Sequence, residues 1–187
     1  MTSIMRESSG EAPSLERIDT CTKFKQSIVE RDFEAFMQDR GSLRKAWHCA
    51  GSLFHLADWV YAAHKKRIDT KFTFLKSGSP RPVSCVKEFA NALGQGHPDF
   101  QLIRGIANAA KHFELFKAPV EHSNPPDMPS HAANTYVTIP TFDPGAFDDA
   151  FDTGEVKLQG KTKDVPLADL AQSVFDMWNR LFATEGW

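Results

Sequence analysis

The segment Pro98–Phe116, PDFQLIRGIANAAKHFELF, divides into an apolar and a polar side when its residues are placed on a helix. The apolar side is formed by Phe100, Ile103, Ile106, Ala110 and Phe113. The opposite side, called the polar stripe below, consists of Arg104, Asn108, Lys111 and His112. Pro98 and Asp99 suit the first turn of a helix, where a missing N–H costs nothing and an acidic side chain is favoured. The segment therefore predicts an amphipathic helix that packs on a helical core.

Length and composition indicate one globular domain. The chain has 187 residues, of which 41% are hydrophobic and 25% charged. Residues 1–13 are small and polar and are expected to be disordered, and residues 14–187 are expected to form a single helical domain. The proline-rich segment at about 118–133 is expected to be a flexible loop within it. The net charge of -2 creates no overall field toward nucleic acid or membrane, so such a partner would need a local patch.

The cysteines and the hydropathy of the sequence indicate in which cellular compartment the protein is expected. Cys21, Cys49 and Cys85 are far apart and odd in number, which indicates reduced thiols. No apolar run approaches the roughly 20 residues of a membrane span, and the N-terminal residues lack the apolar core of a signal peptide. We therefore expect a cytoplasmic protein that has no membrane partner.

Further helices and two short strands are expected on either side of the opening segment. Apolar residues recur at helical spacing in residues 23–38, 43–66, 83–93 and 166–183. Residues 135–139 and 156–159 read as strands that pair with each other. The sequence thus predicts a mainly α fold, a four- or five-helix bundle with a small C-terminal β-hairpin.

The polar stripe holds residue types that suit the cleavage of a phosphodiester without a metal. An arginine grips a phosphate with two parallel hydrogen bonds, and a histidine exchanges protons near neutral pH. Arg104 and Lys111 would steady the phosphate charge, His112 would act as acid or base, and Asn108 would orient the histidine or a sugar hydroxyl. The alternative is an ordinary solvated helix face, which is common for charged residues on a helix.

The run from Arg104 to His112 inside a helical domain of this size resembles the HEPN superfamily. That resemblance implies a helical, commonly dimeric domain of prokaryotic toxins, defence proteins and RNA-processing enzymes, many of them metal-independent endoribonucleases. The segment between Arg104 and His112 is longer here than in the usual motif, and Gly105 replaces the usual polar residue, for which Asn108 would stand in. The chain is also similar to uncharacterised bacterial proteins that carry HxxDW and NxxKH segments together.

The HxxDW segment supplies a second candidate group. His55, Asp58 and Trp59 lie within about one turn of each other on the helix expected at 43–66. One interpretation is that His55 and Asp58 support the polar stripe across a helix interface. Another is a buried network in which Asp58 orients His55. A third is a metal site of His55, Asp58 and His112, although the HExxH pattern of a metal-binding helix is absent.

A basic connection covers residues 64–82 and is the third candidate. It contains Lys65, Lys66, Arg67, Lys71, Lys76 and Arg81, with Asp69 as its acidic residue. Phe72 and Phe74 alternate with polar residues, and cations interleaved with aromatic rings suit single-stranded nucleic acid. We assign nucleic-acid binding to Lys65, Lys66, Arg67 and Lys71; the alternative is a solvated loop with a short strand.

These patterns lead to one expected function and two alternatives. The expected function is a HEPN-like RNA-binding or metal-independent endoribonuclease domain of a bacterial toxin, defence or stress system. Its partners would be RNA, a second copy of the chain, and an antitoxin or other partner protein. No cofactor is expected, because neither glycine pattern for nucleotide binding is present. The alternatives are a non-catalytic helical interaction protein and a metal-dependent helical enzyme.

Overall fold

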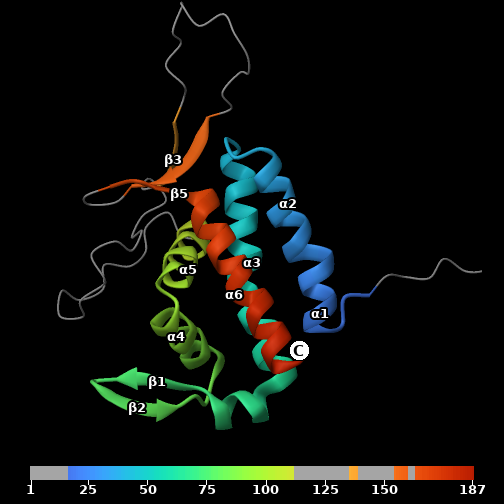
Figure 1. The fold of residues 1–187 in the computed structure, drawn as a ribbon, viewed down its shortest axis with the longest axis vertical. Coiled ribbons are helices and arrows are strands. Elements are labelled where there is room, and N and C mark those ends of the chain that lie inside the picture. Colours follow the sequence, from blue (N-terminus) through green and yellow to red (C-terminus); the bar gives the residue numbers. More distant parts are fainter. Residues whose placement is uncertain (1–16, 112–134, 139–153, 160–162) are drawn as a thin grey trace, which may run out of the picture.

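The computed structural model describes residues 17–111, 135–138, 154–159 and 163–187, which form a mainly helical fold (Figure 1). The helical elements are α1 (Cys21–Phe24), a π-helical segment (Lys25–Val29), α2 (Glu30–Gln38), α3 (Leu43–Lys71), α4 (Val86–Gly96), α5 (Pro98–Lys111) and α6 (Leu167–Glu185). The strands are β1 (Thr73–Lys76), β2 (Ser79–Pro82), β3 (Thr135–Thr138), β4 (Glu155–Leu158) and β5 (Val165–Pro166). The predicted fold class, a helical bundle with a C-terminal hairpin, is confirmed. The predicted tail at 1–13 and loop at 118–133 lie outside the described residues.

Helix α3 lies at the centre, with α5 on one side, α2 on another and α6 running alongside it (Figure 1). Its start is fixed by Ser42, whose hydroxyl accepts a hydrogen bond from the backbone N–H of Lys45. Aromatic side chains link the layers, since Phe100 of α5 contacts both Phe54 of α3 and Trp178 of α6. The core is therefore largely aromatic where α3, α5 and α6 meet.

The first helical run is continuous from α1 to α2. Thr20 caps it by accepting a hydrogen bond from the backbone N–H of Lys23, so the helix begins two residues earlier than the predicted residue 23. Its predicted end at Gln38 is confirmed. The π-helical segment between α1 and α2 places Lys25 against the rings of Phe175 and Phe182 of α6.

Helix α3 continues to Lys71, so the predicted end at residue 66 is wrong. The additional turn carries cations that would repel one another, but carboxylates compensate them. Lys65 pairs with Asp69 one turn later, and Arg67 and Lys71 both pair with the buried Glu185 of α6. The helix kinks at His64, whose φ of -123° and ψ of 22° are not helical.

Residues 77–82, at the end of the basic connection, form a turn followed by strand β2, a strand that the sequence did not indicate. Ser77 and Gly78 form the turn with φ values of 54° and 77°, and β2 pairs antiparallel with β1. Pro80 and Pro82 lie opposite Leu75 and Thr73. Because the backbone N–H of Val83 donates to Phe72, these proline positions fall outside the bonded pairs of the ladder, where a missing N–H is tolerated.

The second sheet is β3–β4–β5, at the opposite end of the bundle from the β1–β2 hairpin (Figure 1). The predicted pairing of the two C-terminal strands is confirmed, and β5 is an addition that the sequence did not indicate. The backbone N–H of Val156 donates to the carbonyl of Arg40 at 2.9 Å. A Cβ on Gly41 would lie 2.3 Å from the carbonyl oxygen of Gly154, so this close approach of two backbones requires glycine.

Candidate functional site

Helix α5 places Arg104, the first residue of the polar stripe, against α4 rather than fully in solvent. Phe100, Ile103 and Ile106 are fully buried, as predicted for the apolar side. Arg104 and Asn108 are half-buried, so this part of the polar stripe is not a fully solvated face. His112 and the side chain of Lys111 lie outside the described residues, and the predicted pairing of Arg104 with His112 stays a prediction.

Arg104 is held by a neutral partner. Its guanidinium donates a hydrogen bond of 2.7 Å to the side-chain oxygen of Asn91, on α4. Burial lowers the pKa of Arg104 from its ordinary value, which means that the site disfavours the charge rather than compensating it. No carboxylate among residues 17–111, 135–138, 154–159 and 163–187 forms an ion pair with it. A half-buried cation in such a setting favours an anion.

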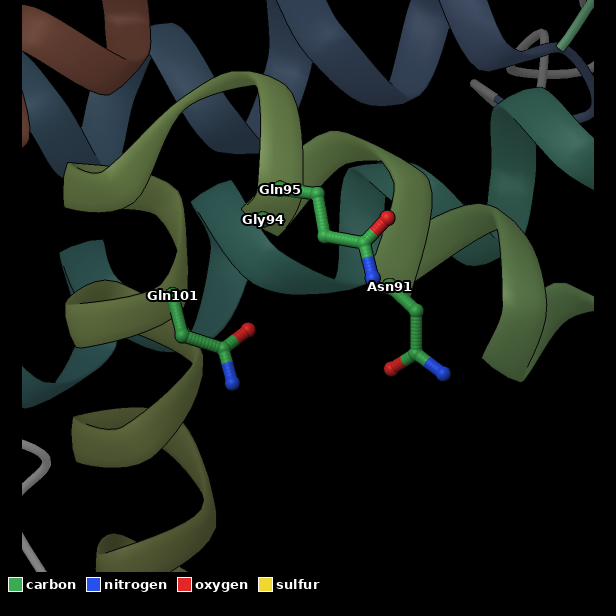
Figure 2. Close-up of a pocket in the computed structure, with 4 residues that line it drawn as sticks. All are labelled: Asn91, Gly94, Gln95 and Gln101. Carbon is green, nitrogen blue, oxygen red and sulfur yellow. The ribbon is translucent and has the colours of Figure 1, made fainter. Parts of the chain in front are cut away.

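A shallow pocket of about 210 Å³ lies beside this hydrogen bond, between α4 and α5. It is lined by Asn91, Gly94, Gln95 and Gln101. Figure 2 shows the carboxamides of Asn91 and Gln101 projecting from the two helices toward the same open side. Gln95 is fixed, because its side chain accepts from the backbone N–H of Leu75 at 2.7 Å and donates to the carbonyl of that residue at 2.9 Å.

These amide residues were not predicted as site residues. The sequence did contain a signal, since Asn91 and Gln95 are four residues apart and share a face of α4. What the sequence could not indicate is that this face of α4 meets the polar stripe of α5. Gly94 allows the contact: a Cβ at this position would lie 2.5 Å from the side-chain oxygen of Gln101.

The predicted supporting group is a local pair on α3. The Nδ1 atom of His55 lies 2.8 Å from a carboxylate oxygen of Asp58, and both side chains are partly exposed. Trp59 stacks on Phe24 of α1 with ring centroids 4.8 Å apart. Within the described part of the chain, no hydrogen bond or ion pair joins His55 or Asp58 to Arg104. The idea that Asp58 orients His55 agrees with the distance, but the predicted burial of this pair is wrong, because both side chains are partly exposed. The predicted support across to Arg104 has no hydrogen bond or ion pair between described residues that carries it.

The alternative metal site was expected at His55, Asp58 and His112. Over the described ranges, no three side chains of the His, Cys, Asp and Glu types gather closely enough to hold a metal ion. His112 is outside those ranges, so this alternative stays a prediction.

The predicted nucleic-acid residues differ in how freely their charge is available. Lys65 pairs with Asp69, while Arg67 and Lys71 pair with Glu185. Lys66 is exposed and has no ion pair with another described residue. Three of the four predicted cations therefore have carboxylate partners.

The β1–β2 hairpin carries two further cations of the basic connection. Lys76 and Arg81 are exposed and form no ion pair with the described residues. Gln95 joins the hairpin to the wall of the pocket through Leu75. Hydrogen bonds thus link the hairpin to the wall of the pocket through Gln95, and the pocket to Arg104 through Asn91.

Comparison with known proteins gives no relative from which a role could be transferred. No family model, no curated protein and no solved structure matches the chain. In the residues that the structure describes, no helix is both long and apolar enough to cross a membrane.

Proposed function

We propose that this protein binds RNA through the polar stripe of α5, as a HEPN-like domain of a bacterial toxin, defence or stress system. The observation that carries the proposal is the half-buried Arg104, which contacts the amide of Asn91 and has no carboxylate partner among the described residues. An RNA phosphate would supply the missing negative charge. An arginine–phosphate contact is strong because both groups are charged and their geometries match.

The proposal extends to cleavage without a metal. In such a reaction the ribose 2′-hydroxyl attacks the adjacent phosphorus and the 5′-oxygen leaves. His112 would remove the hydroxyl proton or protonate the leaving oxygen, Arg104 and Lys111 would hold the phosphate charge, and Asn108 would orient the reacting groups. The resemblance on which these roles rest also implies a homodimer, with an antitoxin or similar protein as partner.

Binding is tested by comparing two variants that lose the same charge. Arg104→Gln removes the half-buried guanidinium, and Arg180→Gln removes an exposed guanidinium on α6. Fluorescence anisotropy with a labelled RNA should show roughly a tenfold to hundredfold loss for Arg104→Gln, the value of a hydrogen bond to a charged group, and little change for Arg180→Gln. Equal affinities of the two variants would refute the proposal.

Cleavage is tested separately. The wild-type protein, incubated in chelator with RNAs of varied sequence, should produce fragments, and His112→Ala should not while keeping its melting temperature. Intact RNA in the wild-type sample would remove the nuclease part and leave RNA binding.

The second candidate is a non-catalytic interaction protein of the same fold. It is favoured by the Arg104–Asn91 hydrogen bond itself, which joins α4 to α5 as a structural link would. In that case Arg104→Gln would lower the melting temperature markedly and RNA would not bind to the wild-type protein.

A further inference from the structure

One face of the central helix α3 is open to solvent around Gly51. The neighbouring helices contact α3 on either side of this face, α1 through the stacked rings of Phe24 and Trp59, and α5 through the tilted rings of Phe100 and Phe54. The open surface between these contacts is called the Gly51 face below. It consists of the exposed Arg44, His48 and Asp58 and the half-buried Trp47, Gly51 and His55.

Gly51 itself is not explained by any contact with the described residues. It lies inside α3, where glycine destabilises a helix relative to alanine, and a Cβ added to it would meet no atom within 4 Å. Gly41 and Gly94 differ from it, because a Cβ there would lie 2.3 Å and 2.5 Å from a neighbouring oxygen. A helix glycine without such a neighbour leaves room for the backbone of another molecule to approach closely.

The charges of the Gly51 face are placed symmetrically about Gly51. Arg44 precedes Gly51 and Asp58 follows it by the same distance, two helical turns or about 10 Å in each direction. Arg44 forms no ion pair with another described residue. The contact of Asp58 with His55 uses one carboxylate oxygen, Oδ2, and the side chain of Asp58 is 49% exposed. Its second oxygen therefore remains as an acceptor for a further partner.

We infer that the Gly51 face binds the same face of a second copy of this chain, with the two α3 helices crossing antiparallel at Gly51 on a two-fold axis. In such a contact, residues that lie equally far from Gly51 on opposite sides of it meet each other. Arg44 then pairs with Asp58 of the second copy, and the ring of Trp47 lies opposite His55 of the second copy. Two equivalent charge pairs form at once, one on each side of the axis.

The charge pattern is what selects a second copy as the occupant and an antiparallel crossing as its orientation. Opposite charges at equal distances from the point of closest approach are complementary to themselves under two-fold symmetry. In a parallel crossing, Arg44 would face Arg44 and Asp58 would face Asp58, which is unfavourable. Tryptophan and arginine are also enriched at protein interfaces, as Trp47 and Arg44 are here. Because the proposed function includes a homodimer, the inference rests on that part of it and adds the surface.

The association state of the full-length protein, measured by sedimentation velocity over a concentration series, tests this surface. Gly51→Gln fills the point of closest approach with a long side chain. Gly96→Gln is the matched control at the last residue of α4, where a Cβ likewise meets no atom within 4 Å. Glutamine is a better helix former than glycine, so neither substitution should weaken its helix. We expect a dimer for the wild type and for Gly96→Gln, and a monomer for Gly51→Gln at the same concentrations.

An exchange of charges tests the pairing of Arg44 with Asp58. Arg44→Asp and Asp58→Arg each bring like charges together at two places, so each should raise the dissociation constant of the dimer by about tenfold or more. The double variant restores opposite charges, and its dissociation constant should return to within about threefold of the wild-type value. Arg44→Asp removes no ion pair between described residues and should keep the wild-type melting temperature, so it serves alone if Asp58→Arg does not fold.

The possible results separate this inference from the proposed function. A wild-type protein that is monomeric at high micromolar concentration would overturn the inference and the homodimer together. A dimer that Gly51→Gln and Arg44→Asp leave unchanged would overturn the inference and leave a homodimer that uses another surface. A double variant that dimerises no better than the single variants would overturn the pairing of Arg44 with Asp58. RNA binding is judged separately, by the comparison of Arg104→Gln with Arg180→Gln.

Discussion

The guanidinium of Arg104 and the side-chain amide of Asn91 face each other across the α4–α5 interface, 2.7 Å apart. This contact joins a cation to a neutral acceptor at a half-buried position, where a carboxylate would have made a stronger pair. A single substitution can therefore separate the stability of the fold from the binding of an anion.

Asn91→Asp should stabilise the fold and weaken RNA binding at the same time. The new carboxylate forms a charge-assisted hydrogen bond with Arg104, worth about 1 kcal/mol more than the present bond. It also neutralises the charge that the proposed function assigns to phosphate. Urea denaturation measures the first effect and RNA anisotropy the second. Asn179→Asp, on α6, adds the same charge elsewhere and is the control; a binding loss in both variants alike would point to net charge rather than to Arg104.

Trp178→Phe should destabilise the protein strongly. The indole N–H of Trp178 donates to the backbone carbonyl of Leu53 at 3.0 Å, and the side chain is completely buried. Losing this hydrogen bond and part of the ring volume should lower the free energy of unfolding by about 1–3 kcal/mol. Trp59→Phe is the comparison, because a phenyl ring can still stack on Phe24. Chemical denaturation with equal losses for the two variants would contradict this ranking.

The free energy of unfolding should decrease at acidic pH because of the lowered pKa of His64. Burial, and then the charge of Arg67, lower the pKa of His64 from its ordinary value of 6.5. Its ring also stacks on Trp187, and Nε2 lies 3.5 Å from the Sγ atom of Cys21. The unfolded chain binds the proton more readily, so stability is full above pH 6.5 and is lost as the pH falls toward the lowered pKa. The free energy of unfolding measured from pH 8 to pH 5 should decline less in His64→Gln than in the wild type.

The three cysteines should react at different rates. Cys85 is exposed, whereas Cys21 and Cys49 are buried, and burial raises the pKa of the Cys49 thiol to about 12. A thiol reagent attacks the thiolate, so the native protein should show one fast thiol and the denatured protein three. Cys85→Ser should remove the fast reaction. A second fast thiol in the native variant would show that the packing around Cys21 or Cys49 opens readily.

Helix positions were largely predictable from the sequence, because periodic apolar residues and capping residues such as Ser42 and Pro98 are local signals. The extent of α3 was not. Its last turn depends on Glu185, which is more than a hundred residues away, and a sequence pattern does not reveal that ion pair. Strand β2 was not predicted, because prolines are unusual in strands, and only the register of the hairpin shows that they occupy tolerated positions.

In the candidate site, too, the local features were predictable from the sequence and the contacts between helices were not. Periodicity placed Arg104 on the polar side of its helix, and the structure agrees that it lies apart from the buried Ile103 and Ile106. Periodicity could not say which neighbour covers that side. The contact with Asn91 and the pocket that includes Gln101 arise from the way α4 and α5 pack, which depends on Gly94 at their contact.

The central helix α3 obtains several of its partners from α6, through Trp178 on Leu53 and through Glu185 on Arg67 and Lys71. During synthesis on the ribosome, α3 is made long before α6 exists. Until α6 emerges, the residues of α3 that it contacts, including Arg67 and Lys71 in the last turn, lack these partners. Folding of the bundle is accordingly completed only after α6 has been made, and a nascent chain that stalls before α6 would be a substrate for chaperones.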